Sequence, residues 1–172
     1  MANNRSSQES IYKHFYHDMF VICKRYAEDA HDALTILNDG FLKAFINISK
    51  YNKQFGSFAP WLKTIIINTA IDYTRGSKRA AQIIHIDTVI DQGKEDLDLD
   101  FSVQQQEISR HLSLLPAVTR LVINLFAFDG YNYKEIAAMA GISESTVRWH
   151  VSEARKKLKL SLQLKQTKHR QL

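Results

Sequence analysis

The residues best suited to chemistry lie near the C-terminus, where polar and charged side chains recur on one side of an amphipathic segment. One apolar stripe runs through this segment at helical spacing: Val147, Val151, Ala154 and Leu158. The side chains off the stripe carry hydroxyl, indole, carboxylate and cationic groups, namely Ser145, Arg148, Trp149, Ser152, Glu153, Arg155 and Lys156. Such groups contact base edges and phosphates, so the pattern predicts binding to duplex nucleic acid.

The residues before this face supply the element that would hold it. Tyr133 to Ala140 has the pattern of a short helix, and Gly141 suits a tight turn that needs a permissive backbone. Ser143 can cap a second helix, and Glu144 then lies in its first turn, where the helix dipole favours a carboxylate. The segment therefore predicts a helix-turn-helix. The alternative, a plain helical hairpin, leaves the basic continuation Arg155-Lys156-Lys157 unexplained.

Composition limits the classes of protein that this chain can represent. Of its 172 residues, 45% are apolar, which is enough for one domain or two small ones. No apolar stretch is long enough to span a bilayer and no signal peptide opens the chain, so we expect a cytoplasmic protein. The single Cys23 cannot form an internal disulfide, and we expect a reduced, half-buried thiol.

The charge is divided unevenly along the chain. Residues 1–86 carry eleven Lys/Arg against seven Asp/Glu, and residues 109–172 carry eleven against four. Residues 87–108 carry one Lys and seven acids. Two basic bodies flanking an acidic middle indicate a polyanionic partner, although solvated surface is an equal alternative for the first body.

Helical periodicity predicts an all-α protein with two small domains joined by a flexible acidic linker, the second domain being the helix-turn-helix. We expect the first domain at 1–79, the linker at 80–102 and the second domain at 103–172. Within them, apolar spacing and breaks predict helices over about 10–27, 29–51, 57–79, 103–114 and 117–128, with a loop at 52–57. Trp61 is expected to anchor the third helix in the domain core.

A second candidate site lies at the end of the first domain. One polar stripe on an otherwise apolar helix is formed by Asn68, Asp72, Arg75 and Arg79. Beside it lie the aromatic residues Phe55 and Phe58, expected to be exposed. Aromatic rings beside a basic track suit stacked single-stranded bases. The alternative is a helix with a solvated side, on which Asp72 and Arg75 form a weak ion pair.

No cluster in the sequence predicts catalysis or a cofactor. His14 and His17 share a helix face, but no cysteine or carboxylate group completes a metal site with them. The chain has no glycine-rich phosphate loop and no motif that places a nucleophile beside a histidine. We therefore expect a protein that is not an enzyme and needs no metal or cofactor.

The two candidate sites, in this order and at this separation, resemble those of a bacterial sigma factor. The resemblance is to the extracytoplasmic-function (ECF) group of the sigma-70 family, and it covers nearly the whole chain. Three blocks carry it: residues 38–45, the block from Gly56 through Trp61 to Arg75, and the C-terminal block with Leu115-Pro116, Tyr133 to Ala137 and Thr146-Val147-Arg148. The block at 56–75 is the specific one, because helix-turn-helix signatures are common.

The resemblance implies that the protein binds core RNA polymerase, directs it to promoter DNA and melts that DNA. It implies polymerase contacts through the helix that holds Asn38, Asp39, Phe41, Leu42 and Phe45. It assigns the minus-10 element to the loop and following helix, through Asn52, Lys53, Gln54, Phe55, Phe58, Asn68, Asp72, Arg75, Lys78 and Arg79. It assigns the minus-35 element to the helix from Glu144, and it implies a linker that threads toward the active-site and RNA-exit channel.

The resemblance further implies an anti-sigma factor as partner, often a membrane-bound one, and a monomer outside the complex. One departure from the family pattern is Ala33-Leu34-Thr35, where the family often has Ala-Glu-Asp; Asp32 lies one place early and Leu34 is left as an apolar residue at the surface. The competing hypothesis is a stand-alone helix-turn-helix regulator with a helical sensor domain. Such a sensor has no reason to carry the block at 56–75.

Overall fold

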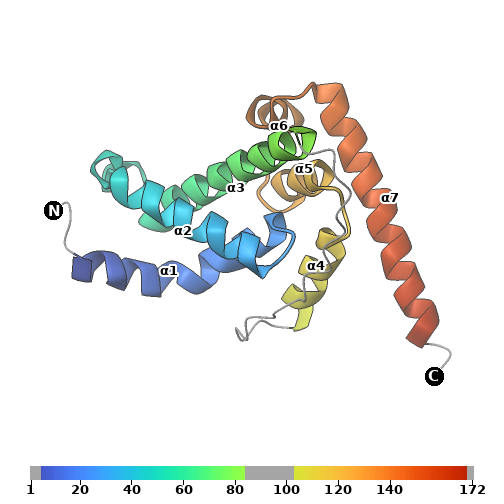
Figure 1. Ribbon diagram of the computed structural model, residues 1–172, viewed down its shortest axis with the longest axis horizontal. Coiled ribbons are helices and arrows are strands. Elements are labelled where there is room, and N and C mark those ends of the chain that lie inside the picture. The colour runs from blue at the N-terminus through green and yellow to red at the C-terminus, as the bar shows by residue number, and fades with distance from the viewer. Residues whose placement is uncertain (1–4, 84–102, 170–172) are drawn as a thin grey trace. The chain divides into compact units, whose positions relative to one another are not determined.

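The computed structural model describes residues 5–83 and 103–169, and for 77–83, 103–105 and 162–169 it describes the backbone only. The chain divides into two compact units, residues 1–98 (unit 1) and 99–172 (unit 2). All regular structure in the described ranges is helical, which confirms the predicted all-α class with two helical domains (Figure 1). No helix within those ranges is long and apolar enough to cross a membrane.

Unit 1 is a bundle of α1 (Arg5–Tyr26), α2 (Ala30–Ile46) and α3 (Phe58–Ile83), in which each helix contacts the other two. The core of the bundle contains apolar side chains that are fully buried, among them Phe20, Cys23, Leu37, Leu62 and Ile66. Cys23 has no exposed surface, so the prediction of a half-buried thiol is wrong. Phe20, three residues before Cys23 in α1, is equally buried, and its ring stacks on that of Tyr16.

Helix α2 begins and ends at side chains that satisfy its free backbone groups. The Asp29 carboxylate accepts a hydrogen bond from the backbone amide of Asp32, 2.8 Å away. At the other end the Asn47 side-chain amide donates to the Lys43 carbonyl, and a 3-10 turn, η1 (Ile48–Lys50), follows. The predicted helix over 29–51 is therefore too long, because Asn47 caps it.

The connection to α3 is more ordered than the predicted loop. It contains a second 3-10 turn, η2 (Lys53–Phe55), capped by the Asn52 side chain, which accepts from the Gln54 amide. Gly56 has φ 143°, a backbone angle that L side chains rarely adopt. Helix α3 then runs through Gly76 to Ile83, so its backbone extends four residues into the predicted linker. The rest of that linker, 84–102, lies outside the described residues.

Unit 2 contains α4 (Val103–Ser113), α5 (Ala117–Ala127), α6 (Tyr133–Ala140) and α7 (Glu144–His169). The helix predicted over 117–128 is α5, and it buries the apolar residues Leu121, Val122 and Leu125. Seven consecutive residues, Thr119 to Leu125, are buried, including Arg120 and Asn124. The reason is that α5 contacts both α6 and α7 and so lies at the centre of the unit.

Candidate nucleic-acid interface

The helix-turn-helix in unit 2 is fixed by three local devices. The Asn132 side chain accepts from the Glu135 amide while the Glu135 carboxylate accepts from the Asn132 amide, a capping box that starts α6. Gly141 ends α6 in the left-handed conformation at φ 66°. Ser143 Oγ accepts from the Thr146 amide and starts α7. The predicted roles of Gly141 and Ser143 are confirmed, whereas sequence analysis missed the capping box, although Asn132 and Glu135 have its spacing.

Helix α7 buries three of the four residues of the predicted stripe, leaves Leu158 half-buried, and keeps its polar side at the surface. Val147, Val151 and Ala154 are buried against the unit. The opposite side exposes Ser145, Arg148, Trp149, Ser152, Arg155 and Lys156, with Trp149 59% exposed. Glu153 is half-buried, with its carboxylate 3.6 Å from Lys157 Nζ. The exposed side of α7 therefore presents hydrogen-bond donors, acceptors and one large, mostly exposed ring.

Contacts across the unit hold several of these side chains in place. The Arg148 guanidinium lies over the Tyr133 ring of α6 and 3.9 Å from the Glu144 carboxylate. Arg155 lies over the Phe126 ring of α5. His150 Nδ1 shares a 3.0 Å hydrogen bond with the buried Thr119 hydroxyl. Sequence analysis missed Tyr133, Phe126 and Thr119 as partners, because each belongs to another helix.

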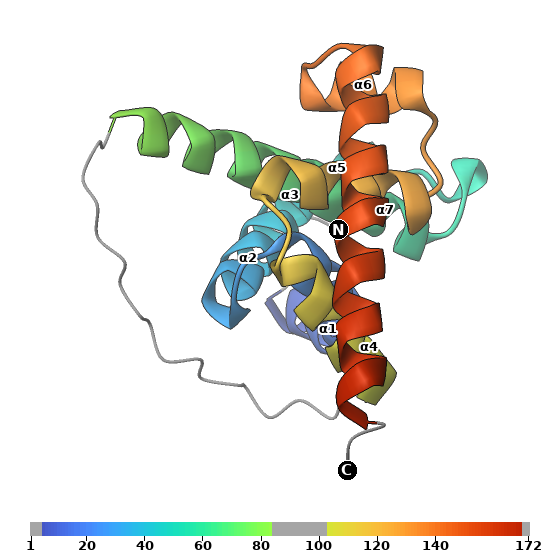
Figure 2. The same ribbon diagram turned by 90° about the vertical axis from the view of Figure 1, so that its right-hand side faces the viewer.

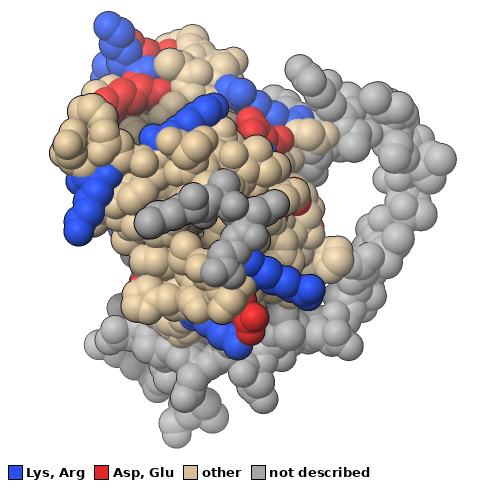
Figure 3. Space-filling view, turned by 90° about the vertical axis from the view of Figure 1, so that its left-hand side faces the viewer, with Lys and Arg blue, Asp and Glu red and all other residues tan. Residues whose placement is uncertain are grey.

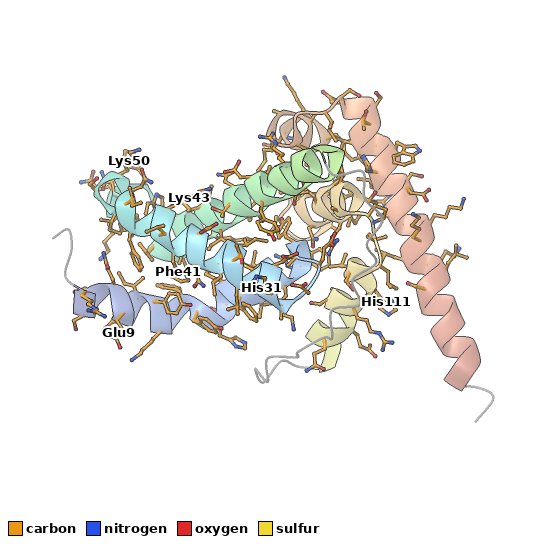
Figure 4. The ribbon with its side chains drawn as sticks, in the orientation of Figure 1. Glu9, His31, Phe41, Lys43, Lys50 and His111 are labelled. Carbon is orange, nitrogen blue, oxygen red and sulfur yellow. The ribbon has the colours of Figure 1, made fainter. Side chains whose placement is uncertain are left out.

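Unit 1 presents the second candidate site on α3. Asn68, Asp72 and Arg75 are exposed, which confirms the polar stripe over the residues whose side chains the structure describes. The Asp72 carboxylate accepts from Lys43 Nζ of α2 at 3.0 Å (Lys43 is labelled in Figure 4), a contact across helices that the sequence did not predict. Lys78 and Arg79 belong to α3, but their side chains lie outside the described residues.

The ring of Phe55 in the loop before α3 is exposed, whereas the ring of Phe58, the first residue of α3, is half-buried. Phe55 is 90% exposed at the end of η2, beside the exposed residues Asn52, Lys53 and Gln54. The Tyr51 hydroxyl donates to the Gly56 carbonyl at 3.1 Å and closes the base of this loop. Phe58, in contrast, is half-buried among the rings of Phe15, Tyr51 and Trp61. The prediction that Phe58 is an exposed aromatic is therefore wrong, because those rings enclose it.

Helix α2 carries the predicted polymerase-binding residues on two different sides. Asn38, Asp39 and Leu42 are exposed, and Ile46 extends this surface at 70% exposure. Phe41 is only 2% exposed: it faces α1, where its ring lies 4.7 Å from that of Tyr12 (Figure 4). Phe41 therefore supports α2 from within the core and offers no surface to a partner. Phe45 is half-buried against Phe41.

The departure from the family pattern at the start of α2 also has a structural outcome. Asp32 accepts a hydrogen bond from the Tyr73 hydroxyl of α3, and burial together with this carboxylate raises the pKa of Tyr73. Leu34 is half-buried, not fully exposed. The acidic group that lies one place early thus joins α2 to α3.

On at least one face of the molecule, basic side chains do not form a single patch (Figure 3). On the face shown in Figure 3, the drawn Lys and Arg side chains are interspersed with Asp and Glu and separated by uncharged surface. That mixture favours the solvated-surface interpretation for this face. The exposed polar sides of α3 and α7 are thus the better candidates for nucleic-acid contact, because they combine cations with groups that read bases.

Comparison with known proteins decides the family. The family model described as sigma-70 region 2 matches residues 11–80, and the one described as sigma-70 region 4 matches residues 105–158. Together they cover both helical units. The chain belongs to the sigma-70 family. The region 2 match spans α1 from Ile11, α2, and α3 up to Ala80, and the region 4 match spans the helix-turn-helix and α7 up to Leu158.

Curated relatives of this sigma factor belong to the ECF group. The ECF RNA polymerase sigma factor SigM of Bacillus subtilis is 26% identical over 153 residues, which cover 88% of this chain and 92% of SigM. The ECF RNA polymerase sigma-E factor of Escherichia coli is also 26% identical, over 82% of this chain and 78% of the relative. The chain is thus an ECF sigma factor of RNA polymerase, and it acts in promoter-specific initiation of transcription.

A solved structure shares the fold. The sigma factor RpoE from Bartonella quintana, crystallised in complex with the anti-sigma factor NepR, matches with a TM-score of 0.54 at 22% identity. The match covers 90% of this chain and 96% of that chain. At this identity the likeness concerns the fold.

Proposed function

We propose that the two units of this sigma factor divide promoter recognition between them. Region 4 reads duplex DNA at the minus-35 element, and region 2 binds core polymerase and opens the minus-10 element. The observation that carries the proposal is the exposed polar side of α7, which lies opposite the buried apolar stripe of the same helix and on which Trp149 is 59% exposed. A second, separate feature is the 90% exposed ring of Phe55 at the tip of the loop before α3.

For the minus-35 element, the exposed side of α7 carries the groups that base readout needs. A recognition helix contacts base edges from its N-terminal part, and the exposed residues there are Ser145, Arg148, Trp149 and Ser152. Glu153 adds an acceptor that suits a cytosine amino group. Arg155 and Lys156 follow one turn later and suit phosphates, which position the helix without reading sequence.

For the minus-10 element, the loop Asn52–Phe55 offers hydrogen-bonding side chains, one cation and one stacking ring. Behind it Asn68, Asp72 and Arg75 form the exposed track of α3, which Lys78 and Arg79 would continue. Lys43 neutralises Asp72 through their 3.0 Å ion pair, so the carboxylate repels a passing phosphate less strongly. Phe58 contributes by supporting the loop from the aromatic cluster.

For its partners, we propose that α2 grips core polymerase through Asn38, Asp39 and Leu42, with Phe41 and Phe45 behind them. Leu42 is 58% and Ile46 70% exposed, and apolar side chains so exposed on one helix suit a protein interface. By analogy with the RpoE–NepR complex, an anti-sigma factor would hold the free protein inactive. The protein would be cytoplasmic, monomeric outside its complexes, and without catalytic activity of its own.

The test is reconstitution with purified core polymerase. We expect co-purification of the full chain with core polymerase and run-off transcription from a subset of genomic fragments. Leu42→Asp and Ile46→Asp should abolish co-purification, and the exposed Lys50→Ala on the neighbouring turn is the matched control. Tight, sequence-specific binding of duplex DNA by the free chain, with no polymerase-dependent transcript, would instead support the stand-alone regulator.

A further inference from the structure

Four side chains from three helices of unit 2 form a connected set, which we name the Arg–aromatic stack. The Arg148 guanidinium lies 4.7 Å from the centroid of the Tyr133 ring. The rings of Tyr133 and Phe126 stack with centroids 5.0 Å apart and planes inclined by 14°. The Arg155 guanidinium lies 5.5 Å from the Phe126 centroid. The set thus joins α7 to α6 and α5, whose arrangement beside α7 is visible in Figure 2.

Tyr133 is itself held in a fixed position. It is the first residue of α6, directly after Asn132, and the capping box between Asn132 and Glu135 fixes the start of this helix. The ring is half-buried and stacks on Phe126 from the buried helix α5. The packing of the unit therefore fixes the position of the Tyr133 ring, and a side chain that lies against this ring is restrained as well.

Ordering matters most for arginine, because a free arginine side chain has many rotamers and loses them when it binds. The planar guanidinium lies well on a ring face, whose electrons attract the cation. Glu144 approaches the same guanidinium at 3.9 Å. Ring and carboxylate together hold Arg148 near the N-terminal end of α7 while 63% of its side chain stays exposed, so its donors remain available.

We propose that Tyr133 is a positioning residue for promoter discrimination. Its ring orders Arg148 so that the guanidinium meets one base pair of the minus-35 element, where guanine O6 and N7 form the acceptor pair that it fits. Phe126 orders Arg155 in the same way, two helical turns further along α7, where the guanidinium meets a phosphate. This inference rests on the proposed function of α7 in reading that element.

The experiment uses holoenzyme reconstituted from the full chain and core polymerase. Transcription is measured from a promoter set that contains every single-base change in the minus-35 region. Arg148→Ala should reduce discrimination at one G·C pair by at least about fivefold, the lower limit for losing a bidentate contact. Tyr133→Leu should reduce discrimination at the same pair by about two- to fivefold, since the cation–π contact is lost. Tyr133→Phe keeps the ring face and should keep the discrimination.

Two further variants separate positioning from a structural role. Lys134→Ala changes the exposed neighbour of Tyr133 and should leave the base-preference profile unchanged. Phe126→Leu should lower transcription from all promoters, because it frees the phosphate-contacting Arg155. It should also weaken discrimination at the Arg148 base pair, because Tyr133 loses the ring on which it stacks. If Tyr133→Leu does not fold, Tyr133→Met replaces it, since methionine fills similar space in a helix without a ring face. Thermal unfolding of each variant shows that it folds.

Each outcome decides the inference. Loss of discrimination at the Arg148 base pair in Tyr133→Leu, with retention in Tyr133→Phe, supports it. If Arg148→Ala abolishes base discrimination at one minus-35 position and Tyr133→Leu does not, the positioning role is overturned and the proposed function stands. If Tyr133→Leu weakens all promoters equally, Tyr133 is structural and the inference fails. If Arg148→Ala changes no position, the inference and the proposed base contact of Arg148 fail together.

Discussion

At the scale of single residues, the side chains on α7 differ in what replacing them should change. Glu153 is half-buried and its carboxylate lies 3.6 Å from Lys157, so its direction is restrained. We expect Glu153→Gln to shift the preferred base at one minus-35 position from cytosine toward adenine. The difference in binding free energy between the two bases should change by about 1 kcal/mol. The reason is that a carboxylate only accepts, whereas an amide both accepts and donates. Transcription from single-base promoter variants measures this shift.

The matched control for Glu153 is Lys156, an exposed residue on the same helix. Lys156→Ala should weaken all promoter variants alike, because a phosphate contact carries no sequence information. A uniform loss in Glu153→Gln would contradict base readout by this residue. A changed preference in Lys156→Ala would contradict the assignment of Lys156 to phosphate.

The Cys23 thiol gives a second residue-scale prediction. It is completely buried in unit 1, and burial raises its pKa to about 12. Because the thiolate is the reactive form, a thiol reagent at pH 8 should label the native protein very slowly and the urea-unfolded protein at once. The labelling rate of the native protein should therefore follow its unfolding. Rapid, complete labelling without denaturant would show that the site opens in the folded state.

At the scale of elements, the packing of α2 on α3 depends on Gly40. A Cβ atom at Gly40 would collide with the Ile66 side chain, which is itself fully buried. We expect Gly40→Ala to lower the free energy of unfolding by about 1–3 kcal/mol, as overpacking does. Gly76 lies within α3 and has open space where a Cβ would be added, so Gly76→Ala should raise stability by about 0.5–1 kcal/mol. Urea unfolding of each variant measures both changes.

A double variant tests the cause of the Gly40 effect. Ile66→Val removes the terminal methyl group nearest to the added Cβ. In that background Gly40→Ala should cost much less than it does alone, so the two changes should be non-additive. Additive losses would show that the collision with Ile66 is not the reason.

The elements also show what sequence could predict and what it could not. Local rules found the buried stripe of α7, the turn at Gly141 and the cap at Ser143, since each depends on neighbours within a few residues. They did not find Lys43 beside Asp72 or Tyr73 beside Asp32, which lie 29 and 41 residues apart and meet only when α2 packs on α3. The same limit explains why Phe58 was predicted to be exposed: the rings of Phe15 and Tyr51 that cover it come from other parts of the chain. The roles of individual residues toward polymerase and promoter came from family resemblance and remain predictions.

At the scale of the whole molecule, the two units present different surfaces to nucleic acid. The exposed side of α7 is a rigid helix face, which suits the major groove of duplex DNA. The loop before α3 instead offers one almost free ring, and a free ring face suits an unstacked base. If the units divide the work in this way, damage to the loop should affect DNA opening and leave duplex recognition intact.

The final prediction tests that division by exchanging Asn52–Phe55 for an inert loop of equal length. Tyr51 and Gly56 stay, because the Tyr51 hydroxyl donates to the Gly56 carbonyl and closes the loop. We expect normal polymerase binding and closed complexes, but no open complexes on duplex promoters. Stacking on an aromatic ring is worth about 1–3 kcal/mol per base, comparable with the cost of unstacking that base.

Permanganate footprinting on duplex promoters measures opening by this variant, and a pre-melted template should partly restore its transcription because the base is already unstacked. Phe55→Ala alone should reproduce much of the defect, since Phe55 supplies the ring. Its stability should be unchanged, because a side chain that is 90% exposed contributes little to the core. Lys50→Ala, on the preceding turn η1, is the matched control and should open promoters normally. Normal opening by the exchanged loop would assign melting to another part of region 2.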